Sequence, residues 1–248
     1  MILVDILQLS TSKILLQSAV KLAEQLGKSF AVSTVAENEI GLKSMLNESV
    51  IVDYQILIKD NSKSLVEICE AEDASFLFIQ LPDGQINSIR RLLNDCRELR
   101  IPYLFYKDSF NPLDLTKVIL PIGFLEEELE KAQFAAAFGR FCGSEVKMLL
   151  ANDYGSKAAT NAEKMKVLFE KFDFSYTLDK ATKDSFKVEV ESIQVAEKEQ
   201  AGIIIVSASR DYGLDDILFG PKEYHVLKKS PIPVLLVNPR GDLYALCD

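Results

Sequence analysis

The sequence of 248 residues contains a single histidine, His225, and this scarcity excludes most conventional catalytic centres. A Ser-His-Asp or Cys-His arrangement would have to use this residue, and no G-x-S-x-G turn supplies a serine for it. His225 is better interpreted as a partly buried helix histidine with satisfied hydrogen bonds. One histidine and scattered cysteines also argue against a zinc site. We therefore expect no catalytic residues, no metal site and no enzyme activity.

The cysteines are few and form no C-x-x-C pair; they are Cys69, Cys96, Cys142 and Cys247. In a chain of this length, isolated cysteines are typical of reduced thiols in a cytosolic protein. The first three lie in helical patterns and are interpreted as small core residues. Cys247 is expected to be exposed. The predicted localisation is cytoplasmic.

Positive charge and long apolar runs are also lacking. The 28 Lys and Arg residues are outnumbered by 37 Asp and Glu, which gives a formal net charge of −9. Nucleic acids and anionic membranes are bound mainly through Lys and Arg, so neither partner is expected. No apolar run approaches the ~18 residues of a membrane span. The opening stretch has no basic region and contains Asp5, which favours a first strand over a signal peptide.

What the sequence does contain is a regular alternation of strand-like and helix-like segments. Strands are predicted at residues 2–9, 30–36, 55–59, 76–81 and 103–106, and again at 118–121, 145–151, 175–181, 203–207 and 233–237. Helical periods cover residues 14–26, 40–46, 62–74 and 87–100, then 126–142, 158–172, 188–200 and 221–229. Strands separated by helices imply right-handed crossovers and parallel sheets. The predicted fold class is α/β, with two tandem, doubly wound, mostly parallel five-stranded sheets of Rossmann-like type.

The two halves repeat each other in order and in detail. Residues 27–30 (Gly-Lys-Ser-Phe) close the first helix of one half, as residues 143–146 (Gly-Ser-Glu-Val) do in the other. Residues 101–104 (Ile-Pro-Tyr-Leu) match residues 232–235 (Ile-Pro-Val-Leu). Such self-similarity indicates a duplicated unit. A polar stretch with Asn111-Pro112 suits a linker, and we predict domains of residues 1–110 and 111–248.

Three stretches of the second half follow one another in a distinctive order. They are Val206-Ser207-Ala208-Ser209-Arg210, then Leu218-Phe219-Gly220-Pro221, then the closing strand Pro233-Val234-Leu235-Leu236-Val237. Through them the chain resembles the universal stress protein family, and the first half follows the same order of elements more weakly. The resemblance implies adenine-nucleotide α-hydrolase-like domains that pair, here as an internal pseudo-dimer. It also implies a module of stress response or regulation, and the missing acid–base residues indicate that this module is non-catalytic. A homodimer and a protein partner stay open.

The resemblance further implies, in one branch of the family, ATP at the carboxyl ends of the strands. That branch has a G-x-x-G-(nine residues)-G-[S/T] pattern and an Asp at the end of the first strand. Here the glycine positions fall on Ser207, Arg210 and Gly220, the hydroxyl position on Pro221 and the Asp position on Gly123. Proline removes a backbone donor where a phosphate would sit, and Glu223 adds an unfavourable charge. We expect this ATP mode to be lost and no cofactor to be bound.

Arg210 indicates an alternative, because it is a cation near a helix start. Together with neighbouring hydroxyls it could hold a nucleotide or another small anion in an altered pocket near Arg210 and Gly220. The candidate ligand-binding residues are Gly123, Ser207, Ser209, Arg210, Gly220 and Pro221. The first half has residues 81–84 (Leu-Pro-Asp-Gly) after its fourth strand and is expected to bind no nucleotide. A ligase or electron-transfer flavoprotein is a third hypothesis, but its phosphate-binding loop is missing.

Three groups of charged residues are interpreted as solvated segments. Glu126, Glu127, Glu128 and Glu130 open a predicted helix, where the helix dipole favours negative charge. Arg90, Arg91, Arg97 and Arg100 form a basic helix that is solvated or docks on an acidic partner. The acidic stretch 211–216 does not meet the EF-hand pattern and is interpreted as a loop.

Overall fold

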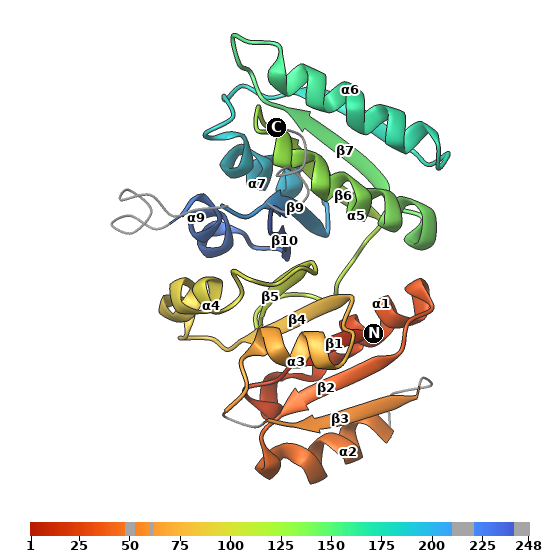
Figure 1. Ribbon diagram of the computed structural model, residues 1–248, viewed down its shortest axis with the longest axis vertical. Helices are drawn as coiled ribbons and strands as arrows, with labels where there is room; N and C mark the ends of the chain where they lie inside the picture. Colours follow the sequence, from red (N-terminus) through yellow and green to blue (C-terminus); the bar gives the residue numbers. More distant parts are fainter. Residues whose placement is uncertain (48–52, 60–61, 210–220, 241–248) are drawn as a thin grey trace. The chain divides into compact units, whose positions relative to one another are not determined.

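The computed structural model describes residues 1–47, 53–59, 62–209 and 221–240. The chain divides into an N-terminal unit, Met1–Leu113, and a C-terminal unit, Asp114–Asp248. In both units strands alternate with helices along the chain (Figure 1).

The N-terminal unit is a parallel sheet of five strands. The strands are β1 (Ile2–Asp5), β2 (Phe30–Thr34), β3 (Tyr54–Ile58), β4 (Phe76–Leu81) and β5 (Tyr103–Lys107). Their spatial order is β3-β2-β1-β4-β5, and every neighbouring pair is parallel. The connecting helices are α1 (Lys13–Leu26), α2 (Glu39–Asn47), α3 (Leu65–Ala71) and α4 (Ile89–Asp95), with 3₁₀ turns η1 (Leu9–Thr11), η2 (Ala36–Asn38) and η3 (Ile86–Ser88).

The C-terminal unit repeats this arrangement. Its strands are β6 (Lys117–Ile122), β7 (Glu145–Leu150), β8 (Tyr176–Lys180), β9 (Ile203–Ser207) and β10 (Val234–Val237). The order β10-β9-β6-β7-β8, again parallel, is that of the first unit counted from the other end. The helices are α5 (Ala132–Ala137), α6 (Lys157–Glu170), α7 (Val188–Glu199) and α9 (Lys222–Lys229), with turns η4 (Glu126–Lys131) and η5 (Phe138–Cys142). α5 packs against α6, and α7 against α9. The predicted class of doubly wound parallel sheets is confirmed.

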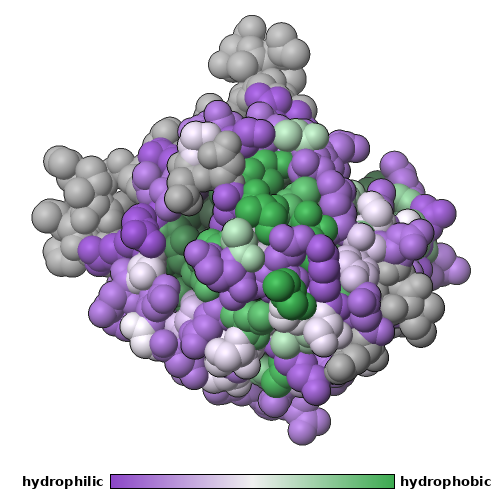
Figure 2. Space-filling model, turned by 90° about the horizontal axis from the view of Figure 1, so that it is seen from below, coloured by the Kyte–Doolittle hydropathy of each residue, from purple (hydrophilic) through white to green (hydrophobic). Residues whose placement is uncertain are grey.

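The core of each unit lies along its central strands. Strands β1, β4 and β9 are buried at every position, as continuous apolar segments covered on both faces should be. The edge strands β3 and β8 contain only half-buried and exposed residues. From the side of α2 and β3, the surface of the molecule shows apolar groups among hydrophilic ones (Figure 2). Exposed apolar side chains of the N-terminal unit include Val35, Ile40 and Ile58.

Two predicted helix ends are confirmed by left-handed glycines. Gly27 closes α1 with φ 59°, and Gly143 closes η5 with φ 67°. Glycine tolerates this backbone region without the Cβ penalty that other residues have. The repeated glycine therefore has the same structural role in both units.

The helix predicted over residues 126–142 is wrong as a single element. The segment is a 3₁₀ turn to Lys131, an α-helix to Ala137 and a π-helix to Cys142. At the π-helix, a Cβ on Gly139 would lie 2.5 Å from the ring of Phe174, so only glycine fits there. The 3₁₀ turn draws charged side chains inward, with consequences for the site described below.

The basic helix predicted over residues 87–100 is also wrong in extent. α4 ends at Asp95, and the chain then turns through a hydrogen bond from Leu99 N to the Cys96 carbonyl. Because Cys96 and Leu99 are buried, the segment folds toward the core instead of continuing outward. Arg97 and Arg100 consequently lie beyond the helix, and the arginines do not form one helical face.

Candidate functional site

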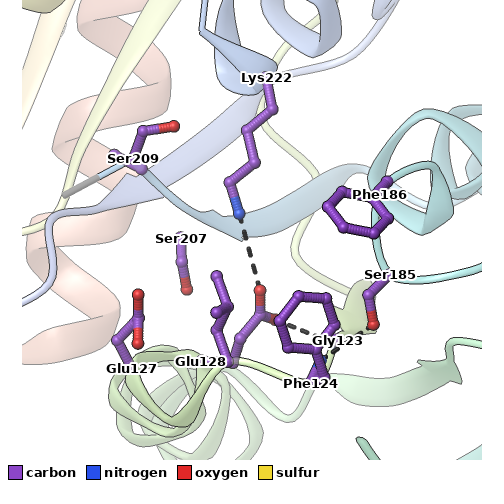
Figure 3. A pocket seen from close by; sticks show the side chains of 11 residues that line it. Gly123, Phe124, Glu127, Glu128, Ser185, Phe186, Ser207, Ser209 and Lys222 are labelled. Atoms are coloured by element: carbon purple, nitrogen blue, oxygen red, sulfur yellow. Dashed lines mark hydrogen bonds and ion pairs between the residues drawn. The ribbon is translucent and has the colours of Figure 1, made fainter. Parts of the chain in front are cut away.

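A pocket of about 380 Å³ lies where β6 and β9 end in the C-terminal unit. These neighbouring strands are the point at which the strand order reverses, and doubly wound sheets bind ligands in the crevice outside the carboxyl ends of such strands. Gly123 and Phe124 follow β6, Ser207 and Ala208 lie at the end of β9, and Lys222 begins α9 (Figure 3). The pocket is therefore built by strand ends and a helix start of one unit.

The sequence-predicted site residues are brought together in part. Gly123, Ser207 and Ser209 line the pocket. Pro221 is buried and is the N-cap residue of α9, with φ −64° and ψ 162°, one position before the first helical residue. Arg210 and Gly220 lie outside the described residues, as do the acidic stretch 211–216 and Cys247.

Ser207 has an unusual position in the pocket. Its side chain is only 1% exposed, and its hydroxyl has no hydrogen-bond partner among the described residues. A buried polar group without a partner costs about 1–3 kcal/mol. Such groups call for a specific reason, for example an unseen partner in a binding site.

Glu128 and Lys131 form a buried ion pair under the pocket, and the expectation that Glu128 and Glu130 are solvated is wrong. The side chains of Glu128 and Lys131 are 5% and 0% exposed, and Lys131 Nζ lies 2.5 Å from Glu128 Oε2. Residues i and i+3 of a 3₁₀ turn eclipse each other, so the irregular segment η4 brings the two charges to one side. Glu130 is buried as well, and its carboxylate accepts a hydrogen bond from Arg240 N. Glu126, by contrast, is 65% exposed.

Lys222 extends the pair into a cluster of alternating charge. Its Nζ lies 3.0 Å from Glu189 Oε1. The same Nζ lies 3.7 Å from Glu128 Oε1 (Figure 3). Burial works against the charge of Lys222, but Glu189 and Glu128 outweigh it and raise the pKa of Lys222 above its usual range. Burial likewise opposes ionisation of Glu128, yet Lys131 and Lys222 hold the pKa of Glu128 below its usual range. Burial raises the pKa of Glu189, against the pull of Lys222.

Glu128 also contacts Gly123, the position at which the resemblance implies an Asp. Gly123 N donates to Glu128 Oε2 over 3.1 Å. A Cβ at Gly123 would lie 3.1 Å from Ser185 Oγ and 3.4 Å from Glu128 Oε1, so a larger side chain would displace its neighbours. A carboxylate thus stands beside the expected position, but a different residue supplies it.

Glu223, the second residue of α9, occupies the donors of Ser209, which follows β9. It is fully buried, and its carboxylate accepts hydrogen bonds from Ser209 N over 3.2 Å and from Ser209 Oγ over 2.8 Å. Backbone N–H groups and hydroxyls are the groups that usually hold a phosphate. Here a carboxylate of the chain itself receives them.

The opposite side of the pocket is aromatic. The rings of Phe124 and Phe186 meet edge to face with centroids 5.6 Å apart. Ser185 fixes this side, since its hydroxyl accepts from Phe124 N and donates to Asp153. The pocket therefore combines an apolar wall with a charged floor.

The corresponding crevice of the N-terminal unit is closed by Gln80. This residue is the fifth of β4, as Ser207 is the fifth of β9. Its Oε1 accepts from Leu7 N and Gln8 N over 3.0 and 2.8 Å. Its Nε2 donates to the Gln8 carbonyl, Thr11 Oγ1 and Asp108 Oδ1 over 2.9, 3.0 and 3.1 Å. The side chain that fills this crevice is fully buried and fully hydrogen-bonded.

The remaining candidates show no chemistry of their own. His225 is half-buried on α9, with its ring against Tyr224. Cys69 and Cys96 are buried, as expected, and burial raises the pKa of Cys69 to about 12; Cys142 is half-buried. Within the described ranges no group of three or more His, Cys, Asp or Glu is placed to hold a metal ion. No helix in those ranges is long and apolar enough to cross a bilayer.

Four residues that line the pocket are not identified as site residues by the sequence pattern: Phe124, Glu128, Phe186 and Lys222. Phe124 follows Gly123 directly, and Lys222 follows Pro221, so both were within reach of the pattern. Nothing in the sequence near Phe186 marks it, because Ser185 and Phe186 join the pocket only through the fold.

Solved structures with a similar fold cover nearly the whole chain. A universal stress protein from Archaeoglobus fulgidus is 14% identical with a TM-score of 0.64, and 97% of each chain is covered. A putative universal stress protein from Pseudomonas aeruginosa is 17% identical with a TM-score of 0.64, covering 99% of this chain and 95% of that one. No protein-family model and no curated protein sequence matches the chain. The likeness is one of fold, and the chain has the tandem fold of the universal stress proteins.

Proposed function

We propose that the protein is a non-catalytic regulatory module of the stress-protein type, in which the C-terminal unit binds a small ligand outside the family's usual ATP mode. The observation that carries the proposal is the open pocket at the β6–β9 strand ends, with the unpartnered hydroxyl of Ser207 in its wall. Its volume of about 380 Å³ lies within the range of small-molecule sites. The filled crevice of the N-terminal unit leaves ligand binding to the C-terminal unit.

The groups that line the pocket support a non-catalytic role. Among the described residues the Ser207 hydroxyl has no hydrogen-bond partner, so no base is placed to activate it. A nucleophilic serine needs a positioned base within hydrogen-bond reach. His225 is not among the residues that line the pocket.

The ATP mode is disfavoured by two residues at the start of α9. Pro221 offers no backbone N–H and no hydroxyl. Glu223 takes the hydrogen bonds of Ser209 that a phosphate would need. Pro221 and Glu223 therefore both support binding of a ligand other than ATP in this pocket.

The proposal is tested by thermal-shift screening with a collection of small compounds and with Mg-ATP. A ligand at ~100 times its Kd stabilises the folded state by about 2.7 kcal/mol. We expect such a compound to stabilise the wild type but not Ser207→Gln, which places in this pocket the side chain that closes the other crevice. Val167→Gln, on an exposed part of α6, is the matched control and should behave as wild type.

Two results would contradict the proposal. One is a screen in which no compound stabilises the wild type, or in which Ser207→Gln responds like the wild type. The other is turnover of Mg-ATP by the wild type above the rate of a protein-free blank.

A further inference from the structure

The pocket also carries information on the charge of its ligand. Resting on the proposed function, we propose that the Glu223 carboxylate is a built-in anion and that the C-terminal pocket binds a ring compound without negative charge. The inference combines three observations. The donors of Ser209 are already hydrogen-bonded to Glu223, the nearby lysines are already paired with glutamates, and the pocket has an aromatic wall and the unpartnered hydroxyl of Ser207.

The donors of Ser209, which follows β9, are the first observation. Ser209 presents its backbone N–H and its hydroxyl to one carboxylate, and both hydrogen bonds are formed within the chain. An incoming phosphate or carboxylate would have to displace Glu223, which is fully buried, from these donors. Displacement would leave two anions close together, and close like charges repel strongly in a medium of low dielectric.

The cations are the second observation. Lys222 is the one cationic side chain among the described residues that line the pocket, and it already contacts Glu189 and Glu128. Lys131, beneath it, is paired with Glu128. Glu127 adds another carboxylate to the lining. Among the described residues, an anion entering this pocket would lose its hydration shell without gaining a positive partner that is not already paired, which is the unfavourable case for a buried charge.

The aromatic wall is the third observation. Phe124 and Phe186 stand edge to face, and Leu125 and Ala208 complete an apolar lining. Aromatic rings prefer edge-to-face or offset contacts with a further ring. Ser207 offers a hydroxyl that can donate or accept one hydrogen bond. A flat ring with one polar edge satisfies both features.

The charge preference is tested with three probes of equal shape, namely benzamide, benzamidine and benzoate. Each is titrated into the full chain and followed through backbone amide NMR shifts. We expect benzamide and benzamidine to shift the amides of Gly123, Ser207 and Ser209. Benzoate should bind at least about tenfold more weakly, because the carboxylates of Glu127, Glu128 and Glu223 repel its negative charge. Ser207→Ala should weaken benzamide binding by roughly two- to tenfold, the worth of one hydrogen bond.

The role of Glu223 is tested by its removal. Glu223→Gln keeps the shape and loses the charge, and Glu223→Ser also opens space. In either variant benzoate and inorganic phosphate should bind at least about tenfold more tightly than in the wild type, since the like charge is gone. Glu126→Gln removes an exposed carboxylate outside the lining and should leave all affinities unchanged.

The outcomes separate this inference from the proposed function. Benzoate or phosphate binding in the wild-type pocket as tightly as benzamide overturns the charge preference but leaves a ligand-binding pocket. Unchanged anion affinity in folded Glu223→Gln overturns the role of Glu223. If none of the three ring probes shifts the pocket amides, the ring inference fails; the proposed function fails only if the wider screen is also empty.

Discussion

The two units have the same strand order, but the crevice at the equivalent strand ends is filled in the N-terminal unit and open in the C-terminal unit. In the N-terminal unit, Gln80 fills the space between the ends of β1 and β4, and its amide lies within hydrogen-bond distance of five partner atoms. In the C-terminal unit, Ser207 holds the same place in its strand and leaves a pocket of about 380 Å³. The comparison teaches that one side chain can decide whether a crevice given by topology is core or site.

Buried charge separates the units as well. In the N-terminal unit, Asp5 is 6% exposed and pairs with Lys59 over 2.7 Å. In the C-terminal unit, two lysines and two glutamates share one buried cluster beside the pocket. A buried pair is seldom stabilising overall, although the loss of one partner is strongly destabilising.

The largest effect is expected for Lys131→Met. The variant leaves Glu128 with less compensation in a buried site, so unfolding free energy should fall by about 3–5 kcal/mol. Lys166→Met is the matched control, because Lys166 and Glu163 form the same i,i+3 pair with Glu163 68% exposed. The control should lose no more than about 1 kcal/mol. Urea denaturation measures both; equal losses would show that burial of the pair does not matter.

The next effect is expected for Gln80→Ala. The amides of Leu7 and Gln8 lose their acceptor, and a buried unpaired donor costs about 1–3 kcal/mol. Hydrogen exchange at these two amides should accelerate, while β9 and β10 keep their protection. If exchange at Leu7 and Gln8 is unchanged, Gln80 does not hold the N-terminal crevice closed.

Acidification should change the stability contributions of Asp5, in the N-terminal unit, and Glu128, in the C-terminal unit, in opposite directions. Burial raises the pKa of Asp5, so the folded state binds a proton more readily than the unfolded chain, whose Asp pKa is about 3.9. This contribution to stability falls as pH rises from the unfolded pKa to the folded pKa.

Glu128 has the reverse dependence. Despite its burial, Lys131 and Lys222 lower its pKa, so its contribution is present above the unfolded Glu pKa of about 4.3 and is lost as pH falls through the folded pKa. Carboxyl ¹³C shifts against pH measure both midpoints. A titration midpoint of Asp5 at or below that of Glu128 would contradict the opposite pH dependence predicted for these two carboxyl groups.

The smallest effect is expected for Ser207→Ala. Its hydroxyl has no partner among the described residues, so its removal breaks no hydrogen bond there; stability should fall by no more than about 0.5 kcal/mol, and relief of the unpaired buried group favours a gain. The residue at the same place in the other unit, Gln80, should cost several times more when truncated. A loss of 2 kcal/mol or more in Ser207→Ala, on the scale of about 1–3 kcal/mol for a buried unpaired group, would show that this hydroxyl is bonded in the folded protein.

The architecture could be predicted because it depends on local patterns. Continuous apolar strands such as 203–207, glycines at Gly27 and Gly143, and the repeated order of elements each reflect backbone and burial rules that act within short segments. Gly123, Ser207 and Ser209 are predicted as site residues through the resemblance to the family's motif, and all three line the pocket.

The electrostatics of the site could not be predicted in this way. Four glutamates in a row of five residues are typical of a solvated helix start, and only the 3₁₀ geometry of η4 turns Glu128 toward Lys131. Lys222 and Glu189 meet from α9 and α7, which are far apart in sequence. The role of Gln80 likewise depends on partners that the chain delivers from residues 7–11 and from Asp108.

The most direct test of the account is an amide NMR map of the whole chain titrated with benzamide. The account predicts shifts at Gly123, Ser207 and Ser209 in the C-terminal crevice and none at Leu7, Gln8 and Gln80 in the N-terminal one. Shifts of equal size in both crevices, or shifts at Leu7 and Gln8 alone, would contradict the claim that one crevice is a site and the other is core.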